Sequence, residues 1–432
     1  MNKMANQAQG WSLALLTKIA GSQLIDQLKL RKWLEKSLYQ SAKHSFKTLS
    51  QTQKIFQSQP QLKQQRLANQ KKDLFDLHLT EDQQMTCDAL GQFATEVLYP
   101  LARDADQHEK FPDVLWQHCS DLGLHDYALT EALGGVATEK NMLSNVLIAE
   151  QLARGDFSLA AGLLSSFSVI NCISQWGSAQ VQADFLPAFA TQTDLRASFA
   201  VQENTAGFNP MQLKTQASIN HLGEIQLQGE KTLVLLGETA DVLIVSAEFN
   251  AQPDVFVVKR DNSIRCKKSP AMGLKATETV TLYFDHTPAQ RLGDHDFNYA
   301  AFLDLGSLMW CALAVGSCEA VKKYCIEYAN QRYAFGEPIS HRQSIAFMIA
   351  DMAIEIEAMR LLLFQAASLA EAGQAFHREA YLARLLCAEK AMKIGTDGVQ
   401  ILGGHGYTKE HPVERWYRDL RATAILHSGL HA

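Results

Sequence analysis

The sequence predicts an α+β protein of several domains, in the order helical domain, antiparallel β domain and helical bundle. The pattern is helical from Leu79 to about Ala190, short β-branched runs continue to Arg291, and a helical period returns after Phe297. Helices and strands that are grouped rather than alternating are typical of separately built domains. The expected divisions are residues 1–77, 78–196, 197–295 and 296–432.

The first division is basic and differs from the rest of the chain. It holds 13 Lys and Arg against 4 Asp and Glu, a charge of +9, and since the whole chain carries −6, residues 78–432 carry −15. Basic and apolar side chains recur through residues 11–48 and predict amphipathic helices. Such helices either contact a membrane surface or a partner, or pack on the protein's own body. A Gln-rich linker is expected over residues 51–70.

The second division is expected to be helical. Glu81 and Asp82 follow Thr80 and would occupy the first turn of a helix, where acidic side chains interact favourably with the helix dipole. We expect this helix to end at Pro100. Two further helices are expected at residues 141–154 and 158–176.

The third division carries short apolar and β-branched runs at close spacing, which favour an antiparallel sheet over βαβ units. The runs are at residues 225–227, 232–236, 242–245, 255–258 and 280–284. The fourth division shows a helical period again. It predicts three long helices at about residues 299–333, 341–373 and 377–402.

The composition excludes several classes of protein. With 47% hydrophobic and 20% charged residues, 25 Gly and 10 Pro, the chain is neither collagen-like nor wholly disordered. It has no run of 18 apolar residues, so no membrane-spanning helix is expected. The acidic body argues against a nucleic-acid partner.

The cysteines predict neither a disulfide scaffold nor a metal site. Eight Cys are present, with no Cys-x-x-Cys motif and no Cys/His cluster. Cys311, Cys318 and Cys325 are spaced seven apart, so we expect reduced packing residues along one helix face. Reduced thiols and the lack of a secretory signal predict a cytoplasmic location.

Two motifs in the last division suggest phosphate binding. Arg332 precedes an aromatic–glycine turn at Phe335, and a guanidinium can grip phosphate oxygens in a planar fork. Gln400 precedes Gly403 and Gly404, where backbone N–H groups could approach a ligand closely. The alternative is a helix C-cap and a surface arginine. Dinucleotide-fold and P-loop motifs are absent from the sequence, as are the Gly-x-Ser-x-Gly and His-Glu-x-x-His motifs.

The two motifs, in a chain of helix–strand–helix order, resemble the acyl-CoA dehydrogenase family. The resemblance covers residues 78–432 and includes residues 131–135, 150–156, 199–201, 229–231 and 272–274. It implies the three-domain fold of that family, FAD as cofactor, and a homodimer or homotetramer. By matching position, the FAD adenosine and pyrophosphate would be held across a subunit interface by Arg332, Phe335, Gln343, Gln400, Gly403 and Gly404. Val201 and Gln202 would be cofactor positions in the β domain.

The reaction that the resemblance implies is α,β-desaturation of an acyl-CoA thioester. A carboxylate removes the α-proton while the β-hydride passes to the flavin. A flavoprotein that accepts the electrons is an expected partner.

The sequence departs from the family where the reaction would occur. The usual catalytic Glu position is His427, and the position used by a minority of relatives is Gly306. Asp304, two residues before Gly306, should face elsewhere on the helix. Leu233-Val234-Leu235 replaces a Trp-Ile-Thr strand, and Ser307 replaces an Arg near the CoA phosphates. The family's last helix is not expected, since the sequence given stops at Ala432.

The sequence thus predicts an intact FAD phosphate site beside an altered reaction centre, and leaves three functions open. The first is an FAD-dependent acyl-CoA dehydrogenase with an unusual or displaced base, for which His427, with an ordinary pKa of about 6.5, is the candidate. The second is a weakly active or inactive homologue that serves as a partner or regulatory subunit, with His427 a bystander. The third is a flavin monooxygenase of the same fold.

Overall fold

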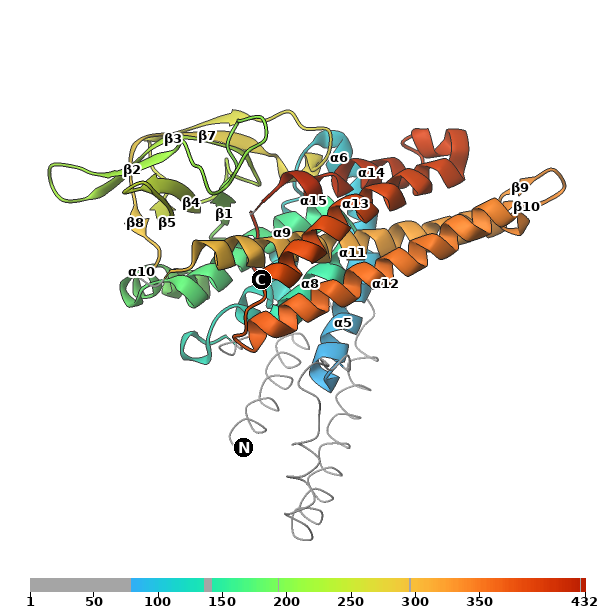
Figure 1. Ribbon diagram of the computed structural model, residues 1–432, viewed down its shortest axis with the longest axis horizontal. Helices are drawn as coiled ribbons and strands as arrows, with labels where there is room; N and C mark the ends of the chain where they lie inside the picture. Colours follow the sequence, from blue (N-terminus) through green and yellow to red (C-terminus); the bar gives the residue numbers. More distant parts are fainter. Residues whose placement is uncertain (1–78, 136–141, 193, 295–296, 428) are drawn as a thin grey trace, which may run out of the picture. The chain divides into compact units, whose positions relative to one another are not determined.

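The computed structural model describes residues 79–432, apart from 136–141, 193, 295–296 and 428. The predictions for residues 11–48 and 51–70 therefore lie outside the described residues. The chain forms two compact units, of which the larger comprises residues 83–120 and 124–432. The site described below lies in this larger unit, which makes up most of the coloured ribbon in Figure 1.

The amino-terminal part of the described chain is helical, as predicted. Its helices are α5 (Glu81–Phe93), α6 (Tyr99–His108), α7 (Val114–Asp121), α8 (Met142–Ala153), α9 (Phe157–Trp176) and α10 (Ala179–Thr191). Helix α9 is capped by Asp156, whose Oδ1 accepts a hydrogen bond from the Leu159 N–H at 2.9 Å.

The prediction that the first helix ends at Pro100 is wrong. Residues Ala94–Leu98 form a π-helical turn between α5 and α6, and the backbone stays helical through it. Pro100 then lies in the first turn of α6. Just before Pro100 the Tyr99 N–H donates to the Ala94 carbonyl, five residues back, so the hydrogen-bond ladder changes register where the proline lacks an N–H.

The middle part is a sheet of eight strands with neighbour order β6-β7-β3-β2-β4-β5-β8, and β1 pairs with β4. The strands are β1 (Ala197–Ala200), β2 (Gln216–Ile219), β3 (Ile225–Val234), β4 (Val242–Phe249), β5 (Gln252–Lys259), β6 (Ile264–Lys268), β7 (Val280–Pro288) and β8 (Gln290–Arg291). Most pairings are antiparallel, as predicted. Strands β1 and β2, which the sequence did not reveal, instead run parallel to β4.

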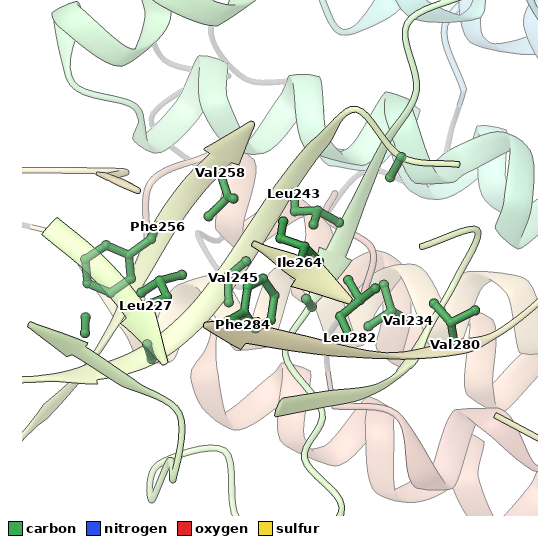
Figure 2. Packing of buried hydrophobic residues seen from close by; sticks show 14 residues of the cluster. Leu227, Val234, Leu243, Val245, Phe256, Val258, Ile264, Val280, Leu282 and Phe284 are labelled. Carbon is green, nitrogen blue, oxygen red and sulfur yellow. The ribbon is translucent and has the colours of Figure 1, made fainter. Parts of the chain in front are cut away.

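The apolar runs that predicted strands form the buried face of this sheet. Figure 2 shows side chains from β4, β5 and β7 packed together, including Val245, Phe256 and Leu282. These three are fully buried. Burial of a side chain of this size stabilises the fold by about 1.5–3 kcal/mol. The cluster as a whole therefore holds the strands of the sheet together.

The carboxyl-terminal part is helical, with bounds close to those predicted. Its helices are α11 (Tyr299–Gln331), α12 (Gln343–Glu371), α13 (His377–Leu402), α14 (Val413–Leu420) and α15 (Ala422–Ile425), and the hairpin β9 (Tyr333–Ala334) and β10 (Glu337–Pro338) joins α11 to α12. Helices α9 and α11 are long and apolar enough to cross a membrane, but most of each is buried inside the unit. Packing in a protein core accounts for their composition.

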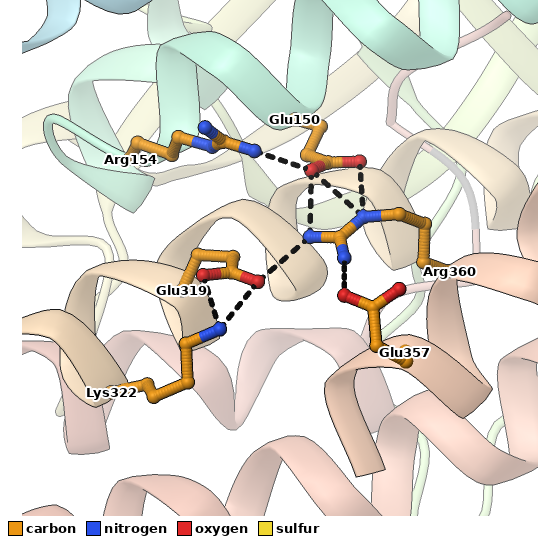
Figure 3. A network of polar contacts seen from close by, with 6 residues as sticks. All are labelled: Glu150, Arg154, Glu319, Lys322, Glu357 and Arg360. Carbon is orange, nitrogen blue, oxygen red and sulfur yellow. Dashed lines mark hydrogen bonds and ion pairs between the residues drawn. The ribbon is translucent and has the colours of Figure 1, made fainter. Parts of the chain in front are cut away.

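A polar network joins helix α8 to helices α11 and α12 (Figure 3). Arg360 of α12 donates to Glu150 of α8 and to Glu319 of α11, each at 3.0 Å. Arg154 and Lys322 extend the network by pairing with the same two carboxylates at 2.9 and 2.8 Å. If these helices shifted relative to one another, buried charges would lose their partners, which is strongly unfavourable. The network therefore fixes how α8, α11 and α12 pack.

The predicted packing role of the cysteines is confirmed. Cys311, Cys318 and Cys325 are buried free thiols on α11. Burial raises the pKa of Cys325 to about 12, which keeps its thiol protonated and unreactive.

Candidate active site

The turn after β1 is held by a buried ion pair. Lys231 of β3 is fully buried, and its Nζ donates to Glu203 Oε1 at 2.7 Å and to the Val201 carbonyl at 3.1 Å. Glu203 also accepts from the backbone N–H groups of Lys214 and Thr215. Burial lowers the pKa of Lys231 to about 8, although Glu203 acts in the opposite direction. The pair therefore fixes the backbone on both sides of Gln202.

Gln202 has a buried acceptor that no neighbour satisfies. Its backbone carbonyl accepts from the Thr232 N–H at 2.9 Å, but its side-chain Oε1 has no hydrogen-bond partner within the described part of the chain. Buried polar atoms are almost always paired in native proteins. An unpaired acceptor at a predicted cofactor position suits a ligand that donates a hydrogen bond.

An apolar cavity of about 150 Å³ lies between β3, the turn around Gly273 and the last helices. Its walls include Leu233, Leu274, Ile425 and Leu426. Leu233 has a φ of 53°, uncommon for leucine, at an irregularity in the pairing of β3 with β7. Strained residues of this kind cluster at ligand sites.

His427 directly follows this cavity wall and is half-buried. Its ring meets the edge of Phe208, with centroids 5.8 Å apart. Burial, reinforced by the positive charge of Arg384, lowers the pKa of His427 to about 4. The sequence-based expectation of about 6.5 is therefore corrected downward, and the imidazole is neutral at pH 7.

Arg384 of α13 lies between the two positions where a catalytic carboxylate was sought. Its Nη1 donates to the Leu426 carbonyl at 2.9 Å and to Ser307 Oγ at 3.3 Å. Ser307 follows the buried Gly306 on α11. Among the residues that the structure describes, no carboxylate pairs with this guanidinium. It is thus a largely buried positive charge beside His427.

Asp304 does not replace the missing carboxylate. Its Oδ2 lies 2.7 Å from His377 Nδ1, and burial raises its pKa. The prediction that Asp304 faces away from position 306 agrees with this pairing. Across the described ranges, no group of His, Cys, Asp or Glu side chains could hold a metal ion.

His431 is a buried residue that sequence reasoning missed. It is fully buried, lies between Phe199 of β1 and Phe302 of α11, and contacts Trp176 at the end of α9. Burial lowers its pKa to about 3. No local pattern in the sequence marks it, because its contacts come from three distant segments.

The six residues expected to hold cofactor phosphates form a separate, exposed group. Arg332, Phe335 and Gln343 lie at the junction of α11, the β9–β10 hairpin and α12, and Gln400, Gly403 and Gly404 lie at the end of α13. All six are exposed, and the Phe335 side chain is 95% accessible.

The conformation of this exposed group leaves room for a ligand. Phe335 and Gly336 both have positive φ, as a tight two-residue hairpin requires. Gly403 has a φ of 59° and caps α13, so the predicted C-cap role is present. A Cβ added at Gly403 or Gly404 would meet no atom, so their backbone faces open space.

The two groups of residues do not meet within one chain. In Figure 1, β1 and the β9–β10 hairpin lie at well-separated places along the larger unit. The cavity beside Leu426 is lined by none of the six exposed residues. The exposed group and the cavity are therefore separate places on one chain.

Three known domain families match consecutive parts of the chain. They are the N-terminal, middle and C-terminal domains of acyl-CoA dehydrogenase, at residues 80–193, 198–287 and 299–429. These matches follow the helical, β and helical parts seen in the structure.

Individual relatives cover most of the chain. Cyclohex-1-ene-1-carbonyl-CoA dehydrogenase of Geobacter metallireducens is 31% identical over 365 residues, which is 81% of this chain and 94% of that protein. The short-chain specific acyl-CoA dehydrogenase of Megasphaera elsdenii is 32% identical over 365 residues, or 81% and 95%. The solved structure of butyryl-CoA dehydrogenase from Megasphaera elsdenii superimposes with a TM-score of 0.75 at 30% identity, covering 82% and 96% of the two chains.

Proposed function

This chain belongs to the acyl-CoA dehydrogenase family, and we propose that it is an FAD-dependent enzyme that desaturates a short acyl-CoA thioester with His427 as the base. One observation carries the assignment of the base: a neutral, half-buried imidazole follows directly on the apolar cavity at the position of the family's carboxylate. Short acyl groups are proposed because relatives named for butyryl-CoA and cyclohexenecarbonyl-CoA cover the same length of chain.

The residues present fit FAD. The orphaned Oε1 of Gln202 and the cavity beside Leu233 suit the ring system, and the open backbone at Gly403 and Gly404 suits the phosphates. Arg332 would add a charge-assisted hydrogen bond to phosphate, which is stronger than a neutral one. Phe335 offers an exposed aromatic face for the adenine. Bound FAD would supply the hydride acceptor.

The chain's own residues would manage the proton. His427, neutral at pH 7, would accept the α-proton of the thioester at a ring nitrogen. Arg384 would hold the Leu426 carbonyl and so keep the His427 turn in place. Its positive charge would also favour the negative charge that develops on the thioester oxygen when the proton leaves. The same charge disfavours the protonated imidazole, so proton transfer to His427 would be slower than to a carboxylate.

We expect a homodimer or a homotetramer built from it, since the two groups of cofactor residues are separate in one chain. Exposed apolar side chains along α12 and α13, including Phe347, Ile354, Tyr381 and Leu385, suit such an interface. An electron-accepting flavoprotein is the expected redox partner. We place the protein in the cytoplasm, with residues 11–48 as a segment for peripheral membrane contact.

The experiment is reconstitution with FAD followed by anaerobic addition of butyryl-CoA, cyclohexanecarboxyl-CoA and longer acyl-CoA thioesters. Bleaching of the flavin absorbance together with formation of enoyl-CoA supports the proposal. Stable flavin binding without bleaching by any thioester supports a partner or regulatory subunit instead. Oxygen consumption that requires an external reductant would identify a monooxygenase.

A further inference from the structure

The end of the described chain folds into the protein between the two elements that flank the proposed reaction centre. Gly429, Leu430, His431 and Ala432 are all buried. The His431 ring lies 6.5 Å from Phe199 of β1 and 5.6 Å from Phe302 of α11, nearly parallel to both at 22° and 27°. Gly429 has a φ of 130°, a backbone conformation that side-chain-bearing residues rarely adopt. The turn inward after His427 therefore depends on this glycine.

The proposed function defines where a substrate would have to pass relative to this segment. The reacting carbons of an acyl thioester must contact the base and the flavin at the same time. They must therefore lie between His427 and the end of β1, where Val201 and Gln202 follow Phe199. His431 is four residues from His427 and packs on Phe199. An acyl group in that position would occupy the space beside Phe199 that the His431 ring fills.

The segment is held by specific contacts, one of which is imperfect. The Trp176 indole Nε1 donates to His431 Nε2 at 3.0 Å, and Gln175 Oε1 lies 3.0 Å from the same nitrogen. Because an indole N–H can only donate, Nε2 must accept, and the proton of the neutral ring lies on Nδ1. His431 Nδ1 is buried and has no partner within the described ranges. A buried donor without a partner is unfavourable. It therefore offsets part of the free energy that the packing of the His431 ring contributes to holding the segment in place.

We infer that Gly429–Ala432 is an internal occupant of the acyl-CoA cleft, which must leave before a thioester can bind. This inference rests on the proposed function. An occupant lowers the apparent affinity of a competing ligand in proportion to the fraction of molecules in which the cleft is open. The segment would thus lower the enzyme's activity. Substrate, or a partner that binds the released segment, would shift the equilibrium toward the open cleft.

The test uses FAD-loaded full-length protein, a chain shortened to end at Ser428, and the variant His431→Ala. Binding of butyryl-CoA is measured by calorimetry, which needs no turnover. If the segment fills the cleft in nine molecules of ten, the shortened chain should bind roughly tenfold more tightly, and His431→Ala should shift in the same direction. The exposed His221→Ala serves as the control and should bind as the parent does.

A peptide of sequence Gly-Leu-His-Ala, added to the shortened chain, should weaken butyryl-CoA binding and quench or shift Trp176 fluorescence. Equal butyryl-CoA affinity in parent, shortened chain and His431→Ala would overturn the inference. Peptide binding without competition would overturn it too, because the seat would then lie outside the substrate path. If the shortened chain does not fold, His431→Ala decides alone. Failure of all variants to bind any acyl-CoA would count against the proposed function, and with it the inference.

Discussion

The exposed phosphate group and the buried reaction centre differ in how they depend on the rest of the chain. Arg332, Phe335, Gly403 and Gly404 match the residue types that the resemblance predicts, and all four are exposed. His427 departs from the family type and is set among Phe208, Arg384 and a buried segment. The first group matches the predicted residue types and is exposed, whereas the second is packed inside the protein and differs from the predicted type at His427.

From this difference we expect that substitutions in the two groups affect cofactor binding and reaction separately. An exposed phosphate site makes few contacts within its own chain, so its residues affect ligand affinity more than folding. In a buried centre, a substitution changes the pKa values of neighbouring groups, the shape of the cavity and the stability of the fold together. The predictions below use this contrast, in order of the size of effect expected.

Substitution of His427 should give the largest effect, on turnover. His427→Ala removes the proposed base and should lower the rate by roughly 10²–10⁴-fold. His427→Glu restores a carboxylate that Arg384 can pair with, so it should match or exceed the parent. Stopped-flow reduction of the flavin measures both. A His427→Ala enzyme as fast as the parent would show that the base lies elsewhere.

The pH dependence of the same rate should follow the lowered pKa of His427. A base must be unprotonated to act, so the rate should stay level from pH 8 down to about pH 5 and fall as pH drops through about 4. A steady-state profile of flavin reduction over this range measures it, with loss of fold at low pH followed by circular dichroism. An inflection near 6.5 would mean that the ring is more exposed to solvent in the working enzyme.

Loss of the Lys231–Glu203 pair should give the largest effect on stability. Lys231→Met leaves the Glu203 carboxylate buried without its cation, which typically costs about 3–5 kcal/mol. Denaturant unfolding measures the change. The exposed Lys267→Met, on β6, should stay within about 0.5 kcal/mol of the parent. Equal stability of the two variants would show that the turn around Gln202 does not depend on the buried pair.

Substitution in the exposed group should affect FAD and leave the fold intact. Arg332→Ala should cost about 1.5–3 kcal/mol of FAD binding, hence roughly tenfold or more in affinity. Flavin retention after gel filtration and the melting temperature without FAD are the two readouts. The control is Arg378→Ala, another exposed arginine, which should retain flavin. If both variants retain flavin like the parent, Arg332 is a surface residue only.

The smallest effects are expected from substitution of two neighbouring glycines. One should change stability through its backbone conformation, and the other should change FAD binding through contact with the ligand. Gly403→Ala should cost about 1–2 kcal/mol of stability, because its φ of 59° with a ψ of −134° is a conformation that residues with a Cβ rarely adopt. Gly404 has no such restriction, so Gly404→Ala should unfold like the parent yet retain less FAD if phosphate lies against its backbone. Thermal unfolding and flavin retention on the same samples measure both. Full flavin retention in Gly404→Ala would place the phosphates elsewhere.

The sequence predicted the long elements well because their patterns are local. Helices α12 and α13 begin and end within about two residues of the predicted bounds, since a helical period sustained over many turns is hard to mistake. Strand β6 was missed because four of its five residues are exposed and three of these are charged, so no apolar run marks it. Pro100 misled because a π-helical turn just before it lets the helix continue past the proline.

The site was predictable only where a motif carries it. Arg332 and Gly403 belong to short strings, whereas the environment of His427 is set by Arg384, 43 positions away, and by Phe208 in the β domain. His431 was invisible to sequence reasoning for the same reason. The pKa of about 4 at His427 follows from burial and charge in three dimensions, and no local pattern encodes either.

The central claim is that an intact FAD site serves an altered but working reaction centre. Its most direct test is the flavin absorbance of the FAD-loaded parent protein during anaerobic titration with butyryl-CoA. We predict that flavin co-purifies with or is retained by the protein, and that its absorbance bleaches slowly and in proportion to the enoyl-CoA formed. Flavin that stays bound and fully oxidised through the whole titration, in the parent and in the chain shortened to Ser428, would contradict it.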